Sequence, residues 1–269
     1  MTHYDPRPIG VFDSGIGGVT VLKALKDRFP HEHFLYLGDT ARLPYGTKSA
    51  DTIRRYSEQN IEFLVKGNVK AVVIACNSAS SQVPERELNG IHVYNVIEPG
   101  AAEALRYTRE KRIGVIGTRA TVQSAAYANA LHKHDASIDI FHEACPLFVP
   151  LAEEGWTDDD VTHAVVERYL TPLMRYKVDT IILGCTHYPI LKHAIQKFVG
   201  ASVKLVDSGV AMAEWLHHDF ESGKLIANDP AVNGVIQFLA TDLSENFKSM
   251  ARRILAPLNA EHFQLVDIN

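Results

Sequence analysis

Ala71-Val-Val-Ile-Ala-Cys-Asn-Ser78 and Thr180-Ile-Ile-Leu-Gly-Cys-Thr-His187 are the two stretches that decide the fold. In each, a short apolar run ends in a cysteine, and polar residues follow. A run that is apolar at every position is typical of a buried parallel strand that opens onto a loop at its carboxyl end. Ligands bind at that edge in open α/β sheets. The sequence therefore predicts an α/β protein in which Cys76 and Cys185 face each other across one ligand.

Strand and helix patterns alternate along nearly the whole chain. Short apolar runs predict strands at residues 9–12, 34–37, 71–75, 93–97, 112–116, 138–142, 180–183, 203–206, 235–239 and 263–266. Amphipathic segments between them predict helices at residues 19–29, 51–65, 121–132, 161–174, 190–199 and 210–220. This alternation favours parallel sheets that are covered by helices on both faces.

A weak internal repeat divides the chain in two. Ile9-Gly-Val-Phe-Asp-Ser-Gly15 resembles Ile113-Gly-Val-Ile-Gly-Thr-Arg119, and the two cysteine strands align at nearly the same spacing. Chance similarity between strands is the alternative to duplication. We expect two similar doubly wound parallel-sheet domains, residues 1–97 plus 208–269 and residues 98–207, related by a pseudo-twofold axis with the active site in the cleft between them. The chain would cross at Glu98-Pro-Gly100 and return at Asp207-Ser-Gly209.

Composition argues against several classes of protein. The chain has 269 residues, of which 46% are hydrophobic and 22% charged, an ordinary globular balance. A net charge of −5 without a Lys/Arg block argues against a nucleic-acid partner. The apolar runs, about six residues long, are too short to span a membrane, and the start has no apolar segment typical of secretion. Three cysteines without a C-x-x-C pair argue against disulfides or structural zinc and favour a reducing cytosol.

Two loops between a strand and a helix are candidates for ligand binding. In Asp13-Ser-Gly-Ile-Gly-Gly18, glycines allow the backbone to approach a ligand, and the helix N-terminus favours an anion. The segment lacks the third glycine of a dinucleotide fingerprint and the Lys-Ser/Thr of a P-loop. Pro44-Tyr-Gly46 is the second loop. Either segment alone is also compatible with a purely structural turn.

Polar residues follow both cysteines, in Cys76-Asn-Ser78 and Cys185-Thr-His187. Helix N-capping would explain either segment alone, but it does not readily explain the same pattern at two aligned strand ends. A metal site built from these thiols and the imidazole is disfavoured, because the spacing is poor for zinc. Cys145 has no such neighbours and is predicted to be a small buried hydrophobic residue.

These segments resemble the cofactor-independent glutamate racemases of the aspartate/glutamate racemase superfamily. The resemblance implies interconversion of L- and D-glutamate without cofactor or metal, which supplies D-glutamate for peptidoglycan, and so for cell shape, in a bacterial cytoplasm. The matching segments run in order over residues 9–209: Gly10-Val-Phe-Asp-Ser-Gly-Ile-Gly-Gly18, Tyr36-Leu-Gly-Asp39, Pro44-Tyr-Gly46, Ala75-Cys-Asn-Ser78, Gly114-Val-Ile-Gly-Thr118, Pro150-Leu-Ala-Glu-Glu-Gly155, Leu183-Gly-Cys-Thr-His-Tyr-Pro189 and Leu205-Val-Asp-Ser-Gly209.

The family pattern also implies a role for each matching residue. Cys76 would be the base that acts on D-glutamate, and Cys185 the base that acts on L-glutamate. Asp13, Glu154 and His187 would be auxiliary acid–base groups, although the sequence leaves open whether Glu153 or Glu154 faces the site. Many members have Thr in place of Ser78, so only a methyl contact differs. The substrate-binding residues would be Asp13, Ser14, Tyr45, Gly46, Asn77, Ser78, Thr186 and His187.

The chemistry is consistent with this set of residues. The α-proton of an amino acid is very weakly acidic, and no pyridoxal or metal signature is present to spread the charge of the carbanion. Preorganised donors must therefore stabilise that charge, and we expect them in the amides of residues 13–18, in Asn77 and Thr186, and at helix N-termini. A free thiol has a pKa of about 8.5, and a nearby histidine or helix N-terminus lowers it, which favours the reactive thiolate.

Two other functions stay open. The first is racemisation of aspartate or a related amino acid, since one methylene is worth only about 1–3 kcal/mol of discrimination in a pocket. The second is a two-lobed protein that binds an acidic amino acid, for which paired cysteines are needless. Relatives are often dimers, which admits a homodimer here. We expect no activation by a cell-wall precursor, because the chain lacks the longer N-terminal extension of the members activated in that way.

Overall fold

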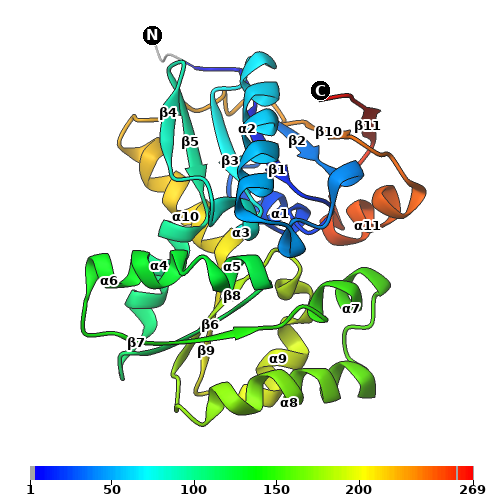
Figure 1. Cartoon of the computed structure of the whole chain (residues 1–269). Coiled ribbons are helices and arrows are strands. Elements are labelled where there is room, and N and C mark those ends of the chain that lie inside the picture. The colour runs from blue at the N-terminus through cyan, green and yellow to red at the C-terminus, as the bar shows by residue number, and fades with distance from the viewer. Residues whose placement is uncertain (1–3, 259, 269) are drawn as a thin grey trace.

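The computed structural model describes residues 4–258 and 260–268, and its strands form two sheets that lie one above the other in Figure 1. The larger sheet has the order β11-β10-β2-β1-β3-β5-β4. Its pairs are parallel apart from the antiparallel pair of β4 with β5. The strands are β1 (Ile9–Asp13), β2 (Phe34–Gly38), β3 (Ala71–Ile74), β4 (Arg86–Leu88), β5 (Ile91–Asn95), β10 (Ile236–Ala240) and β11 (His262–Leu265).

The smaller sheet is fully parallel and has the order β7-β6-β8-β9. This order repeats the order β2-β1-β3-β5 within the larger sheet, with β6 in the place of β1 and β8 in the place of β3. The predicted repeat is thus matched by a repeat in topology. We call the elements of the larger sheet and its covering helices the first half, and those of the smaller sheet the second half. The strands are β6 (Arg112–Gly117), β7 (Asp139–Ala144), β8 (Thr180–Gly184) and β9 (Lys204–Asp207).

The central strands of both sheets are buried on both faces, as the continuous apolar runs predict. In β3, Val73 belongs to a core with α1 (Val19–Arg28), α10 (Ser208–Glu221) and α11 (Glu245–Leu255). Its neighbours Val72 and Ile74 belong to a second core with α2 (Ala50–Lys66). Successive side chains of a strand point to opposite faces, so a strand between two helical layers must be apolar throughout.

The smaller sheet follows the same rule. On β8, Ile181 and Leu183 pack in a core with α7 (Phe148–Glu154), α8 (Asp160–Met174) and α9 (Lys192–Val199), whereas Ile182 lies in a core with α4 (Ile97–Tyr107) and α6 (Ala126–His134). The parallel α/β class with helices on both faces is confirmed.

Two helices connect the halves. Helix α4 leads from β5 to β6, and α10 leads from β9 back to β10; the two pack against each other. The predicted crossing segments lie at the beginnings of these helices: Glu98-Pro99-Gly100 is in the first turn of α4, and the Asp207 side chain caps α10 by accepting from the Gly209 amide at 2.8 Å. The division into two domains at residues 97 and 207 stays a prediction.

Several predicted elements differ from those observed. The strand predicted at residues 93–97 ends at Asn95, whose side chain accepts from the Ile97 amide at 3.0 Å and turns the chain into α4. The helix predicted at residues 121–132 is broken into α5 (Arg119–Gln123) and α6, because Ala125 adopts a left-handed conformation with φ of 54°. The sequence analysis missed β4, α3 (Asn77–Ser80), α4, α7 and α11.

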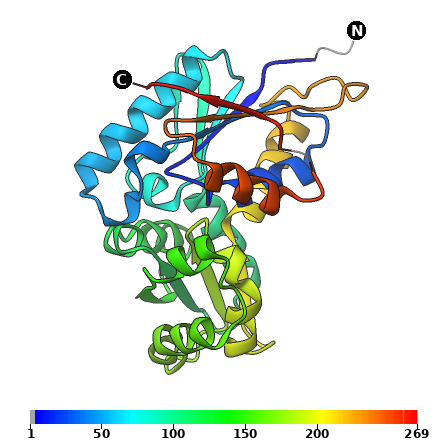
Figure 2. The ribbon, with the colours of Figure 1, turned by 90° about the vertical axis from the view of Figure 1, so that its right-hand side faces the viewer.

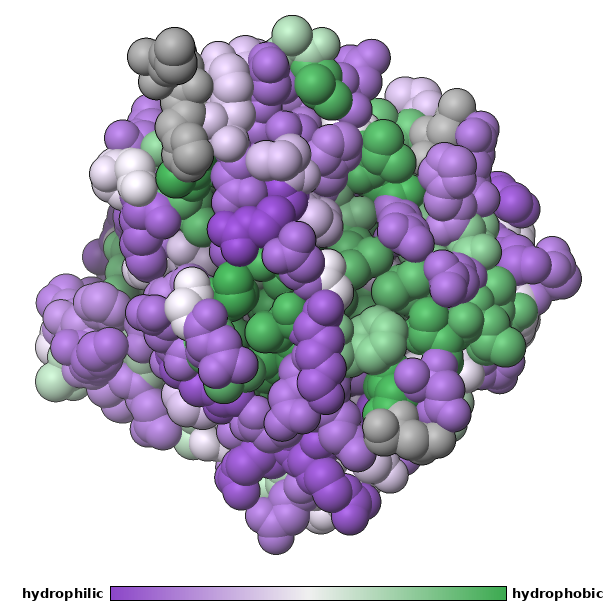
Figure 3. All heavy atoms as spheres, turned by 90° about the horizontal axis from the view of Figure 1, so that it is seen from above, coloured by the Kyte–Doolittle hydropathy of each residue, from purple (hydrophilic) through white to green (hydrophobic). Residues whose placement is uncertain are grey.

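Figure 2 shows the two halves from the side, with α11 in red packed on the first half. Seen from above, the surface is mainly hydrophilic, and apolar side chains are visible between the polar ones (Figure 3). In the part of the chain that the structure describes, no helix is long and apolar enough to cross a membrane.

Candidate active site

Both predicted thiols line one cavity of about 250 Å³ between the two halves. Cys76 lies just beyond the carboxyl end of β3, and Cys185 just beyond that of the corresponding strand β8. All three cysteines are unbridged. Cavities for drug-sized ligands measure about 300–1,000 Å³, so this one suits a smaller molecule.

Most of the predicted site residues line this cavity. Glu154 does not, and its side chain is exposed. Asp13 is completely buried behind the cavity wall, where Thr186 Oγ1 donates to its carboxylate at 3.3 Å. The predicted residues that do line the cavity are Ser14, Tyr45, Gly46, Cys76, Asn77, Ser78, Cys185, Thr186 and His187.

Cys185 is part of a hydrogen-bonded chain with His187 and Glu153. The Cys185 sulfur lies 3.8 Å from Nδ1 of His187, and Nε2 of the same ring lies 3.0 Å from Oε1 of Glu153. Burial alone would lower the pKa of His187, but its hydrogen bonds to Cys185 and Glu153 raise that pKa to about 10. An imidazolium in this position stabilises a negative charge on the Cys185 sulfur. Glu153, and not Glu154, therefore contacts the site histidine.

Cys76 has different surroundings. Its sulfur lies 3.7 Å from Oγ of Ser14. Burial and the nearby Asp13 carboxylate raise the pKa of Cys76 to about 12, against smaller opposing effects of hydrogen bonds from Ala79 and Ser14. The two thiols are almost equally hidden, with 5% of Cys76 and 6% of Cys185 exposed. The two thiols therefore differ in their neighbouring groups and not in their access to water.

The Asp13 carboxylate occupies the N-terminus of α1. The Gly15 amide donates to it at 2.9 Å, and the Gly18 amide also donates to it. Burial raises the pKa of Asp13, although the charge of His187 and these hydrogen bonds oppose the rise. We expected the amides of this loop to face a ligand, but two of them already bind this carboxylate. Burial of this carboxyl group beside both Cys76 and His187 makes it a candidate acid–base group of the site.

Two glycines allow the halves to approach closely around the cavity. A Cβ on Gly17 would lie 2.4 Å from Oγ1 of Thr186 and 2.5 Å from the His187 ring. A Cβ on Gly46 would lie 2.8 Å from Cβ of Thr118. In both cases a glycine of the first half meets a side chain of the second half. At Gly17 and Gly46, a side chain would push the halves apart.

Several side chains that we expected to bind a ligand are already hydrogen-bonded. The Tyr45 hydroxyl donates to Asp39, which also binds Arg42, so its ring is held in place. Ser78 Oγ lies 2.9 Å from Oγ1 of Thr118, which makes a hydrogen bond between the halves.

Sequence reasoning missed several residues of the cavity wall. Thr118 follows β6 as Ser14 follows β1, so the internal repeat carried the signal for it. Arg119 is exposed and is the one Lys or Arg among the described residues that line the cavity. No Asp or Glu belongs to that lining. The missed residues are Pro44, Thr47, Thr118, Arg119, Pro146, Val149 and Pro150.

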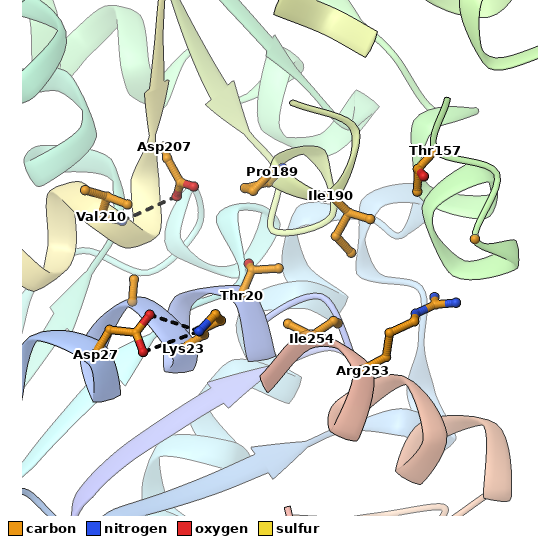
Figure 4. Close-up of a pocket in the computed structure, with 12 residues that line it drawn as sticks. Thr20, Lys23, Asp27, Thr157, Pro189, Ile190, Asp207, Val210, Arg253 and Ile254 are labelled. Carbon is orange, nitrogen blue, oxygen red and sulfur yellow. Dashed lines mark hydrogen bonds and ion pairs between the residues drawn. The ribbon is translucent and has the colours of Figure 1, made fainter. Parts of the chain in front are cut away.

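A second, larger cavity lies on the other side of the segment that carries His187 (Figure 4). Its wall includes Thr20, Ile190 and Arg253, with an ion pair between Lys23 and Asp27. Thr20 Oγ1 donates to the Thr186 carbonyl at 2.8 Å. This wall therefore supports the active-site segment from behind and contains none of the predicted site residues.

Within residues 4–258 and 260–268, no group of three or more His, Cys, Asp and Glu side chains is arranged to hold a metal ion. The cavity lining offers two thiols and one imidazole, with the Asp13 carboxyl group buried behind the wall and Glu153 hydrogen-bonded to the imidazole.

Comparison with known proteins connects this arrangement to a family. The family model described as Asp/Glu/Hydantoin racemase matches residues 17–216. A glutamate racemase of Aquifex pyrophilus is 49% identical over 250 residues, which cover 92% of this chain and 93% of the relative.

Solved structures show the same similarity. A glutamate racemase isoform of Bacillus anthracis superposes with a TM-score of 0.91 at 34% identity and 97% coverage of each chain. A glutamate racemase of Francisella tularensis, in complex with D-glutamate, superposes with a TM-score of 0.89 at 37% identity and 98% coverage of each chain.

Proposed function

Because the chain belongs to the Asp/Glu/hydantoin racemase family and is an isomerase of the glutamate racemase type, we propose that it interconverts L- and D-glutamate with Cys76 and Cys185 as opposing bases. The observation that carries this proposal is that the two thiols follow corresponding strands of two sheets with the same strand order and line the same cavity.

The reaction requires one proton to leave the α-carbon and another to arrive on the opposite face. With L-glutamate bound, the Cys185 thiolate removes the α-proton, so that an S–H bond forms as the C–H bond breaks. The electron pair passes into the α-carboxylate, and the Cys76 thiol then delivers its proton to the other face of the carbon. This leaves D-glutamate, a thiol at Cys185 and a thiolate at Cys76. The reverse reaction uses the same groups in the opposite order.

The groups that surround the two thiols support the first of these directions. His187, with its pKa raised to about 10, is protonated at neutral pH and stabilises a thiolate at Cys185. Cys76, with its pKa raised to about 12, is a protonated thiol. One thiolate and one thiol are the pair that conversion of L-glutamate needs. Before the next L-glutamate reacts, Cys185 must lose a proton and Cys76 must gain one.

We propose that Glu153 supports proton transfer at Cys185, in place of the Glu154 that the family resemblance suggested. Glu153 binds the far nitrogen of His187 and so stabilises the imidazolium. Asp13, buried near Cys76, is proposed to hold or release a proton on the other side. Neither carboxyl group attacks carbon in this scheme.

The developing negative charge needs donors that are in place before the reaction. We propose that Asn77, Thr186 and the backbone amides of the cavity wall supply them, with Ser14, Tyr45, Gly46 and Ser78 completing the binding site. We further propose that the product supplies D-glutamate for peptidoglycan in a bacterial cytoplasm.

Solvent deuterium tests the two-base step directly. L-Glutamate is incubated with the purified protein in D₂O, and proton NMR follows the α-position at early times. The first D-glutamate should carry deuterium, because Cys76 delivers a proton that never belonged to the substrate. The remaining L-glutamate should stay protiated at those times, and the pattern should be mirrored when D-glutamate is the substrate.

Extensive protium in the first product would rule out the assignment of Cys76 and Cys185. Circular dichroism with D-glutamate and, separately, with D-aspartate distinguishes the remaining alternatives. Loss of optical activity with D-glutamate alone supports the proposal. Loss with D-aspartate alone would indicate an aspartate racemase, and no change with either would indicate a binding protein.

A further inference from the structure

A chain of hydrogen bonds runs through Asn77, the residue next to Cys76. The Tyr127 hydroxyl donates to Oδ1 of Asn77 at 2.7 Å, and Nδ2 of Asn77 donates to Oγ of Ser208 at 3.3 Å. All three residues are almost fully buried, with 1% of Tyr127, 2% of Asn77 and 1% of Ser208 exposed. Of the three, only Asn77 lines the active-site cavity.

Two hydrogen bonds hold the Asn77 amide in the orientation that the structure shows. An asparagine amide has an oxygen that only accepts and a nitrogen that only donates, and exchanging the two changes little in its shape. In the structure the amide oxygen accepts from the Tyr127 hydroxyl, and the amide nitrogen donates to Ser208. One of its two N–H groups binds Ser208, which leaves the second for a ligand. Burial raises the pKa of Tyr127, so the phenol keeps the proton that it donates.

The three residues come from three different parts of the fold. Asn77 begins α3 in the first half, Tyr127 lies on α6 in the second half, and Ser208 begins the connecting helix α10. The Tyr127 ring also packs against α4, where a Cβ on Gly100 would lie 3.1 Å from it. The orientation of the Asn77 amide therefore depends on residues from both halves and from a connecting helix.

We propose that Tyr127 and Ser208 are positioning residues that fix the Asn77 amide with its free N–H toward the substrate carboxylate. This inference rests on the proposed racemisation. Without the phenol, the Asn77 oxygen loses its donor, and the amide rotates or becomes disordered. The donor would then be misaligned when charge develops on the substrate, which lowers kcat more than it raises KM.

The test compares three variants with the wild-type protein in the racemase assay. Tyr127→Phe removes one hydroxyl and keeps the ring, and it should lower kcat about tenfold or more, since loss of a direct donor of this kind costs about 10²–10³. Ser208→Ala should lower kcat less, because the phenol still orients the amide. Tyr94→Phe is the matched control: its hydroxyl donates at 2.6 Å to Asp219, and Tyr94 does not line the cavity. It should reduce thermal stability and leave kcat and KM unchanged.

A double-mutant cycle with Asn77→Ala separates positioning from a general structural effect. If Tyr127 acts through Asn77, Tyr127→Phe should have no further effect on kcat in the Asn77→Ala background. Wild-type kcat in the Tyr127→Phe protein, or fully additive losses in the double variant, would overturn the inference while leaving the racemase function intact. If Tyr127→Phe does not fold, the same cycle with Ser208→Ala decides. A wild-type protein without racemase activity would instead refute the proposed function.

Discussion

The two halves of the active site share one topology and differ in chemistry. Strand order β2-β1-β3-β5 in the first half is repeated as β7-β6-β8-β9 in the second, and each cysteine follows the corresponding strand. Two positions after the cysteine, however, the first half has Ser78 and the second has His187. A hydroxyl cannot stabilise a thiolate as an imidazolium can.

A second difference lies at the ends of the neighbouring strands. β1 ends in the buried Asp13, whereas the corresponding strand β6 ends in Gly117. The Asp13 carboxylate raises the pKa of Cys76, while the positive charge of His187 lies beside Cys185. The comparison teaches that a repeated backbone can place two thiols at corresponding positions while their neighbours give them different electrostatic surroundings.

Removing each of the two cavity thiols in turn should have the largest effect, and it tests whether both are required as bases. Cys76→Ala and Cys185→Ala should each reduce racemisation at least about 10³-fold, because neither base can replace the other on the opposite face. Cys145→Ala is the control: this buried thiol does not line the cavity. Its activity should be nearly that of the wild type, and circular dichroism should show an intact fold in all three. Near wild-type racemisation in the Cys76→Ala or the Cys185→Ala protein would contradict the assignment of both thiols as bases.

Substituting Glu153 and Glu154 of α7 one at a time tests which carboxylate supports His187 in the second half. Glu153→Gln removes the negative charge that helps to raise the pKa of His187, so the imidazolium and the Cys185 thiolate become less stable. Turnover of L-glutamate should fall about 10- to 100-fold, as expected for the loss of a hydrogen bond to a charged group, which contributes about 1.5–3 kcal/mol. Glu154→Gln, at an exposed neighbouring position, should stay within about twofold. The opposite ranking would return the role to Glu154, and a rise in KM at constant kcat would make Glu153 a binding group.

Alkylation measures the difference between the two thiols without substrate. Iodoacetamide reacts with thiolates, and an imidazolium beside a thiol favours the thiolate, so at neutral pH it should modify Cys185 faster than Cys76. The rate at Cys76 should climb as the pH rises toward its pKa of about 12. Peptide mass spectrometry after timed quenching distinguishes the sites. Equal rates at neutral pH would mean that the two halves are chemically alike.

The smallest effect concerns the charge on the cavity wall. Arg119, on the second half, lines the cavity of a protein whose net charge is −5. Arg119→Gln should raise KM for glutamate about two- to fivefold with little change in kcat, as expected for an exposed charge interaction of up to about 1 kcal/mol. Added salt should reduce the difference. Arg168→Gln on α8 changes the net charge equally, and Arg168 does not line the cavity. An equal rise in KM in both variants would mean that only overall charge matters.

Local patterns in the sequence predicted the parts of the fold that depend on local physics. Apolar runs predicted most strands, since a strand buried on both faces must be apolar throughout, and the ends of two runs predicted which cysteines share a cavity. The pattern for α11 was also present, with Phe247, Met250, Ala251 and Leu255 on its buried side, and was overlooked. The break at Ala125 had no strong local signal.

The choice between Glu153 and Glu154 shows what the sequence by itself did not decide. Both are carboxylates in one short helix, and neighbouring residues of a helix point in directions about 100° apart. Phe148, Leu151 and Ala152 pack in the core and fix how α7 is rotated. That rotation brings Glu153 to His187 and leaves Glu154 exposed. The sequence determined the strands, the thiols and the candidate acids, whereas tertiary packing decided which acid meets the histidine, because the rotation of a helix is set by the partners against which it is buried.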